Sequence, residues 1–104
     1  MNLSIDLFDC KNPTEQLETI TKVLFENNYK REARIYSVIL AKTKQTENHT
    51  LDISYKTVAA AFLELAGEQP PTEKEFMNAI SNLKKIKVRF YDHTKRLRTT
   101  PLIS

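Results

Sequence analysis

A chain of 104 residues, 40% of them hydrophobic and 28% charged, is long enough for one domain with one hydrophobic core and not for two. The single glycine argues against a barrel or sandwich with many tight turns, so helices should dominate. The net charge of +3 is unevenly spread: residues 1–27 hold two basic against five acidic residues, a net −3, whereas residues 84–104 hold seven against one, a net +6.

The chain begins with an apolar alternation and two predicted helices. Leu3, Ile5 and Leu7 alternate with polar residues, which predicts a short strand or an extended arm within residues 1–12. The run Asn-Pro-Thr-Glu at 12–15 combines a cap, a proline and a glutamate typical of a helix start. We therefore predict one helix over about 13–27 and a second over about 30–43. The second contains a buried stripe of three residues, Ile35, Val38 and Ile39.

The middle of the chain predicts a loop, a short strand and a third helix. Residues 44–48 are polar, and the alternation after them indicates a strand over 50–53. Ser54 should cap the next helix, and Gly67 should end it in the left-handed conformation. The predicted core stripe of this helix consists of Val58, Ala61, Phe62 and Leu65.

The last predicted helix spans 73–85 and begins with the clearest local signal in the chain. Thr72 and Glu75 have the spacing of a capping box, in which each side chain binds a backbone N–H of the first turn. The apolar positions that follow are Phe76, Ala79, Ile80 and Leu83. The other side of the helix holds the polar residues Lys74, Asn78, Ser81, Asn82 and Lys85.

A basic hairpin is predicted after this helix, because the apolar period changes from helical to alternating at Lys87. Val88 and Phe90 should face the helices, with Leu97 on the same face, and residues 92–94 should form the turn. A lone hairpin is marginally stable in water, so the strand at 50–53 is expected to complete a three-stranded sheet. The element order predicts an α+β, helix-rich winged helix-turn-helix: helix, helix, strand, helix, helix, hairpin.

Three stretches of the second half of the chain carry a family resemblance. They are the strand LDIS running into the helix YKTVAAAFLEL, the connector EQPPTEKEF leading into FMNAISNL, and the hairpin KVRFYDHTKRLRTTPLIS. Together they resemble the winged-helix domains of plasmid replication initiators and of the archaeal and eukaryotic origin-recognition family. The resemblance covers about half the chain and implies recognition of origin DNA. Initiators usually carry two such domains, and the origin-recognition family adds an ATPase module whose glycine-rich phosphate loop has no counterpart here.

We therefore expect a DNA-binding protein acting in replication initiation or transcription regulation, of plasmid or phage type. In a winged helix the second helix of the helix-turn-helix enters the major groove, where lysine, asparagine and serine can read base edges. Arginines of the wing suit phosphates and the minor groove. The predicted DNA-binding residues are Lys74, Asn78, Ser81, Asn82, Lys85, Lys87, Arg89, His93, Lys95, Arg96 and Arg98.

Catalysis, metal binding and cofactors are not expected. Cys10 is the single cysteine, so no intrachain disulfide can form, and an intracellular, cytoplasmic location fits best. His49 and His93 lie far apart without carboxylates or thiols at metal-ligand spacing. No signal peptide is recognisable, and the longest apolar run falls short of the roughly 18 residues of a membrane span. We expect no enzyme, no cofactor and no membrane association.

Three other partners stay open at the level of sequence. The main alternative is a protein-interaction module or an inhibitor that binds a host protein through the same scaffold. RNA is another, because phosphate contacts look alike in both nucleic acids, and a homodimer through the N-terminal strand and first helix is a third. Charge placement should discriminate: a surface shared by Lys85, Lys87, Arg96 and Arg98 favours nucleic acid, and a divided one favours a protein.

Overall fold

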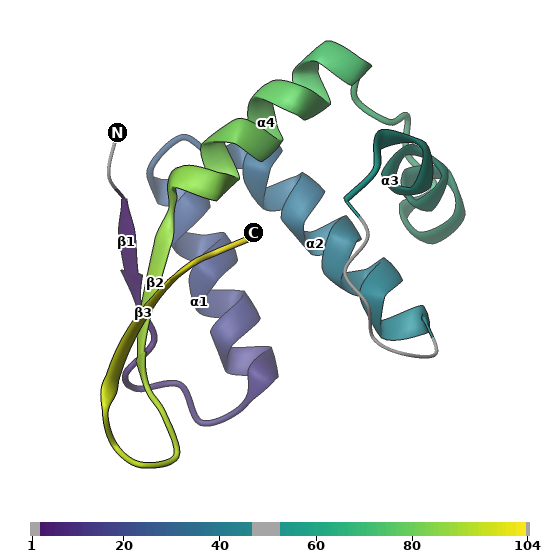
Figure 1. The fold of residues 1–104 in the computed structure, drawn as a ribbon. Coiled ribbons are helices and arrows are strands. Elements are labelled where there is room, and N and C mark those ends of the chain that lie inside the picture. Colours follow the sequence, from purple (N-terminus) through teal and green to yellow (C-terminus); the bar gives the residue numbers. More distant parts are fainter. Residues whose placement is uncertain (1–2, 47–52, 104) are drawn as a thin grey trace.

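The computed structural model describes residues 3–46 and 53–103, which form an α+β, helix-rich fold (Figure 1). Four helices and a small sheet account for most of the described chain. In order, the elements are β1 (Ser4–Asp6), α1 (Pro13–Glu26), α2 (Lys30–Gln45), α3 (Tyr55–Ala61) with a π-helical turn after it (Phe62–Ala66), α4 (Glu73–Lys85), β2 (Lys87–Tyr91) and β3 (Leu97–Pro101).

The helices begin where the capping signals predict. The Thr72 hydroxyl accepts a hydrogen bond from the backbone N–H of Glu75 at 3.2 Å, and the Glu75 carboxylate accepts from the backbone N–H of Thr72 at 3.1 Å. This reciprocal box confirms the predicted start of α4. At α1 the Asn12 side chain accepts from the Glu15 N–H at 2.9 Å, but the Glu15 carboxylate binds the N–H of Lys11 instead.

Two helices end in left-handed residues. Gly67, with φ of 61°, terminates the π-helical turn as predicted. Asn28, with φ of 64°, ends α1 in a Schellman arrangement. Its N–H donates to the carbonyl of Phe25 at 3.1 Å, and the N–H of Tyr29 donates to the carbonyl of Leu24 at 2.7 Å. The chain can therefore reverse between α1 and α2 without leaving these carbonyls unpaired.

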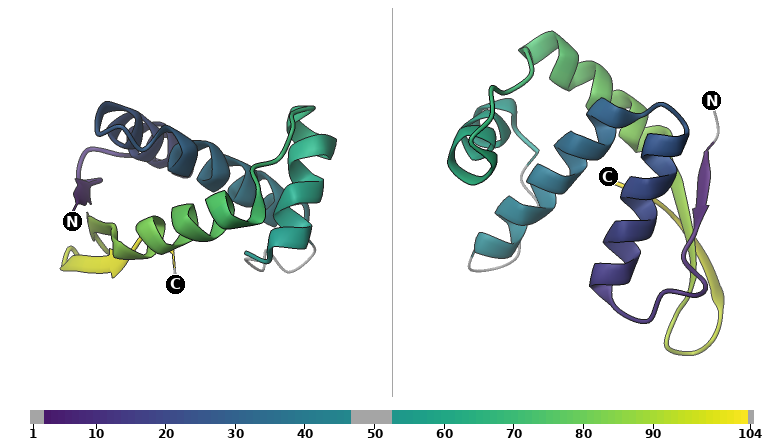
Figure 2. Two further views of the ribbon diagram at one scale, coloured as in Figure 1. Left: turned by 90° about the horizontal axis from the view of Figure 1, so that it is seen from above. Right: turned by 180° about the vertical axis from the view of Figure 1, so that it is seen from behind.

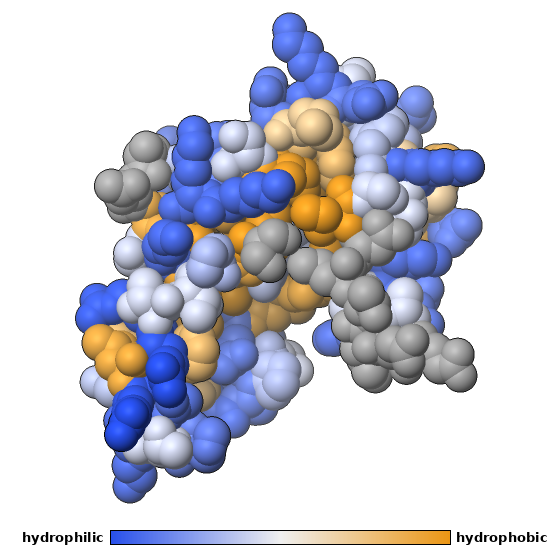
Figure 3. All heavy atoms as spheres, viewed as in Figure 1, coloured by the Kyte–Doolittle hydropathy of each residue, from blue (hydrophilic) through white to orange (hydrophobic). Residues whose placement is uncertain are grey.

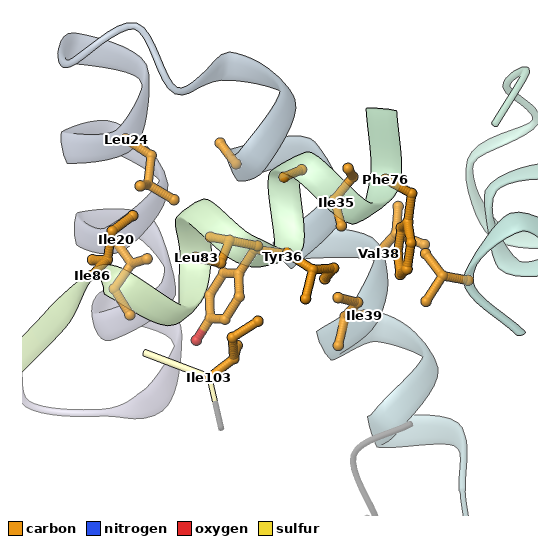
Figure 4. Packing of buried hydrophobic residues seen from close by; sticks show 14 of the residues in the cluster. Ile20, Leu24, Ile35, Tyr36, Val38, Ile39, Phe76, Leu83, Ile86 and Ile103 are labelled. Atoms are coloured by element: carbon orange, nitrogen blue, oxygen red, sulfur yellow. The ribbon is translucent and has the colours of Figure 1, made fainter. Parts of the chain in front are cut away.

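The core is built around α2, which contacts α1, α3 and α4. Its predicted stripe, Ile35, Val38 and Ile39, is buried. Figure 4 shows these side chains gathered with others from α1, α4 and the C-terminal segment, including the deeply buried Leu24 and Ile103. The helix that carries the polar candidate residues, α4, is therefore fixed against α2 along its apolar face.

The sheet has the order β1-β2-β3 and differs from the prediction in its third strand. β1 pairs in parallel with β2, with Ile5 opposite Val88, and β3 pairs antiparallel with β2. Of the predicted strand at 50–53, residues 50–52 lie outside the described residues and Ile53 is not in a strand. The third strand of the described sheet is β1, from the N-terminal segment. Ile5 in this strand and Leu7 just after it are both buried.

Leu97 and Leu65 were predicted to face the core, and both predictions are wrong. Side chains directly opposite in an antiparallel pair share one face, and Leu97 is paired with Tyr91, whereas Phe90 is paired with Arg98. Leu97 therefore lies on the face away from Val88 and is 48% exposed. Leu65 is 37% exposed because the π-helical turn breaks the 3.6-residue period from which its burial was predicted.

The described part of the chain is flat, with principal extents of 40 × 33 × 20 Å. α4 crosses the molecule and leads directly into β2 (Figures 1 and 2). The turn between β2 and β3 projects beyond the helices in both figures. The exposed side of α4 and this projecting hairpin are thus adjoining parts of one continuous segment, residues 73–101.

Candidate nucleic-acid interface

One side of α4 forms an exposed polar stripe. The helical period places four of its members opposite the buried Phe76 and Leu83 and places Lys84 at the edge, beside Met77, which is 58% exposed. Each polar member is exposed. None of these polar side chains has a hydrogen-bond or ion-pair partner within residues 3–46 and 53–103. We call this set the α4 stripe: Lys74, Asn78, Ser81, Lys84 and Lys85.

The α4 stripe differs from the sequence prediction by two residues. Lys84 was missed, although it follows Ser81 by three residues and the helical period could have placed it there. Asn82 was predicted on the exposed side, but its amide donates to the Glu32 carboxylate of α2 at 3.0 Å. Glu32 is only 7% exposed, so Asn82 supplies a partner for a buried acidic group and joins α4 to α2.

The hairpin turn is organised by the carboxylate of Asp92. One oxygen accepts from the backbone N–H groups of Thr94 at 2.8 Å and Arg96 at 3.0 Å, and from the Thr94 hydroxyl at 2.6 Å. The other accepts from the Arg98 guanidinium at 2.7 Å. The Thr94 hydroxyl, the Arg98 guanidinium and the Arg96 N–H all favour the charged form, and they hold the pKa of Asp92 well below its ordinary range.

The predicted wing residues divide into paired and unpaired cations. Besides Arg98, Arg89 is paired: it lies 3.5 Å from the Asp6 carboxylate. The others are exposed and have no ion-pair partner in the described part of the chain. These unpaired predicted side chains are Lys87, His93, Lys95 and Arg96.

The predicted basic residues do not share one face of the hairpin. Lys87 and Arg89 alternate with Val88 and so point to the outer side of the sheet, away from the helices. Arg98 is paired with Phe90 and points to the opposite side. By the criterion of charge placement, this division of Lys87 from Arg98 favours a protein partner, whereas the unpaired α4 stripe favours nucleic acid.

The space-filling view shows hydrophilic side chains over α4 and the hairpin, with apolar side chains visible among them in both places (Figure 3). Exposed large hydrophobic residues of the hairpin are Tyr91 and Leu97. Apolar side chains therefore interrupt the basic surface of the hairpin. A partner that covers this surface must contact apolar groups as well as cations.

Comparisons with models of protein families, with curated proteins and with solved structures give no match to this chain. Within residues 3–46 and 53–103, no three His, Cys, Asp or Glu side chains gather as a metal site needs. Every helix in the described chain is too short or too polar to cross a membrane. His49 lies outside the described residues, and the half-buried Cys10 has its Sγ 3.4 Å from the Thr19 hydroxyl.

Proposed function

We propose that this protein binds double-stranded DNA as a winged helix, with α4 in the major groove and the β2–β3 hairpin along the backbone. The observation that carries the proposal is the α4 stripe, whose lysine, asparagine and serine side chains have no partner within the described residues. Side chains of this kind, displayed from one side of a helix, suit base edges and phosphates in a groove about 12 Å wide.

The order of elements supports the winged-helix part of the proposal. α2, α3 and α4 are followed by a hairpin, with β1 and α1 added in front. α3 and α4 form the helix-turn-helix pair, joined by residues 67–72, and α4 is its second helix. Burial of the apolar side of α4 against α2 leaves the α4 stripe as the side that can enter a groove.

The hairpin turn would supply the phosphate contacts. Asp92 fixes the turn through its own hydrogen bonds, so the unpaired cations Lys95 and Arg96 are presented from an ordered segment. Lys85 and Lys87 connect this turn to the α4 stripe along the chain. Such a protein would act by occupying a site at which replication or transcription begins.

The test is a titration into labelled random-sequence duplex at about 50 and about 200 mM salt, because binding that neutralises phosphates weakens steeply with salt. Variants Lys74→Ala/Lys85→Ala and Lys95→Ala/Arg96→Ala should each weaken binding at least tenfold and lower the salt slope by about 2. The control Lys11→Ala/Lys22→Ala removes the same charge from two exposed lysines of the acidic N-terminal segment, whose ammonium groups have no ion-pair partner among the described residues, and should change little. Equal weakening in the control would contradict the proposal.

A protein partner is the second candidate, favoured by the opposite directions of Lys87 and Arg98. A protein-binding scaffold needs no continuous basic surface. Under this function the duplex titration would show no binding at about 50 mM salt, where phosphate contacts are strongest. The α4 stripe and hairpin variants would then lose a partner captured by the unmodified protein.

A further inference from the structure

The outer face of the sheet carries an exposed row of three apolar side chains. The register sets Asp6, Arg89 and Thr99 side by side and places Tyr91 opposite Leu97. Phe8 lies in the turn after β1, and its ring contacts Tyr91. Their exposed fractions are 37% for Phe8, 57% for Tyr91 and 48% for Leu97. We call these three residues the aromatic row. Single exposed apolar residues are common on proteins, but these three are neighbours, through the ring contact and the cross-strand pair, and form a contiguous patch.

The two rings of the aromatic row already contact each other and a cation. The centroids of Phe8 and Tyr91 are 4.9 Å apart with their planes inclined by 36°. The Arg89 guanidinium lies 5.4 Å from the centroid of the Phe8 ring, and it also pairs with the Asp6 carboxylate at 3.5 Å. Both rings are held by contacts with neighbouring side chains and are still exposed. Little side-chain entropy should therefore be lost when a flat ligand stacks on them.

The charges around the aromatic row favour an anionic ligand. Lys87 and Arg89 lie on the side of the row nearer α4, and the unpaired Lys95 and Arg96 lie on the other side, in the hairpin turn. Of the acidic side chains near the row, Asp6 is paired with Arg89, and the exposed Asp9 follows Phe8, so the cations outnumber the unpaired acidic groups. Aromatic side chains are enriched in protein interfaces too, but the combination of exposed rings with unpaired flanking cations is that of platforms for single-stranded nucleic acid.

We propose that the outer face of the sheet binds single-stranded nucleic acid, with unpaired bases stacked on Tyr91 and Phe8 and phosphates held by the flanking cations. Stacking of this kind tolerates any base, since every base has a π-face. The platform uses no side chain of the α4 stripe. It is therefore independent of the duplex proposal, and a protein with both surfaces could hold a duplex and an unpaired strand together.

The test is the fluorescence anisotropy of a labelled, mixed-sequence DNA strand of about 12 nucleotides, within the usual site sizes of such platforms. Loss of one or two stacked bases should weaken binding at least tenfold in Phe8→Leu/Tyr91→Leu, which keeps the surface apolar but removes the rings. Tyr91→Phe retains a ring and should bind within about twofold of the unmodified protein. Phe25→Leu, on α1, removes a 49% exposed ring elsewhere and should bind normally.

Two further measurements separate this proposal from its rivals. Lys74→Ala/Lys85→Ala should lose duplex affinity while keeping single-strand affinity, so either proposal can fail alone. In the unmodified protein, the Tyr91 ring protons should shift on addition of the strand, a readout that needs no variant. Unchanged affinity in both Phe8→Leu/Tyr91→Leu and Tyr91→Leu would overturn the platform. Unshifted Tyr91 ring protons would also overturn it. So would a dimer of this protein that Tyr91→Leu disrupts without changing the affinity for the single strand.

Discussion

Lys95 is the residue at which backbone strain and candidate function meet. Its φ of 63° is left-handed, a conformation that costs an L-residue about 1–2 kcal/mol and glycine far less. Lys95→Gly should therefore raise the free energy of unfolding by about 1 kcal/mol, measured by thermal unfolding, while weakening duplex binding. Lys95→Ala removes the same charge without relieving the backbone and should not gain stability. Equal stability of the two variants would refute this account.

Asp92 makes the hairpin turn sensitive to acid. Its folded-state pKa is lowered, so its contribution to stability is complete above the unfolded pKa of about 3.9 and is lost as the pH falls through the lower folded value. The difference in Tm between the unmodified protein and Asp92→Asn should be constant from pH 7 to about pH 5 and should shrink steadily below about pH 4. Asp9→Asn, at an exposed position, is the control. A difference that persists undiminished at pH 2 would contradict the prediction.

Asn82 and Asn78 should have opposite roles although they stand on the same helix. Asn82→Ala leaves the buried Glu32 carboxylate without its amide donor and should lower the free energy of unfolding by about 1–3 kcal/mol, with duplex affinity unchanged. Asn78→Ala, in the α4 stripe, should weaken duplex binding and leave stability unchanged within about 0.5 kcal/mol. Chemical denaturation measures the stability of each variant, and the duplex titration measures its affinity. The opposite pattern, with Asn78→Ala destabilised and Asn82→Ala weakened in binding, would refute the assignment.

At the scale of elements, local signals located the helices but did not predict that β1 pairs with β2. The Thr72–Glu75 box, the Asn12 cap and Gly67 act within a few residues, so the sequence alone placed these helix ends. The third strand, by contrast, depends on which segment reaches β2. Alternation was visible at both 3–7 and 50–53, and nothing local chose between them.

The candidate site, too, could be predicted from the sequence only where local pattern decides the position of a side chain. The period of α4 identified the exposed positions of the α4 stripe, but a periodic pattern cannot say where α2 crosses it, so Asn82 was grouped with Asn78. The register of the hairpin decided that Leu97 lies outward, and the aromatic row became visible only with it. Phe8 gave no sequence signal, because its partner Tyr91 is 83 positions away and is reached only through the parallel pairing of β1 with β2.

β1 should contribute strongly to stability despite being three residues long. Ile5 is 1% exposed and lies opposite Val88, so Ile5→Ala removes a fully buried side chain from between the sheet and the helices. We expect a loss of about 2–5 kcal/mol in the free energy of unfolding. Ser4→Ala, at the exposed neighbouring position, should change it by less than about 0.5 kcal/mol. Similar values for the two variants would show that β1 is dispensable.

At the scale of the whole molecule, the uneven charge along the chain determines how a polyanion such as DNA would approach the protein. α1 lies in the acidic segment, with Glu18 and Glu26 exposed, while the α4 stripe and the hairpin turn carry unpaired cations. A polyanion is repelled from one and attracted to the other, so encounters should be oriented before any specific contact forms.

Reversing the acidic charge should therefore misdirect binding as well as strengthen it. Glu18→Lys/Glu26→Lys creates a basic patch on α1, and duplex can then bind there without the α4 stripe. In this background Lys74→Ala/Lys85→Ala should weaken duplex binding much less than in the unmodified protein, as measured by the four affinities of a double-mutant cycle. Strictly additive losses would mean that the acidic segment does not orient the complex, because α1 and the α4 stripe would then contribute independently to one bound arrangement.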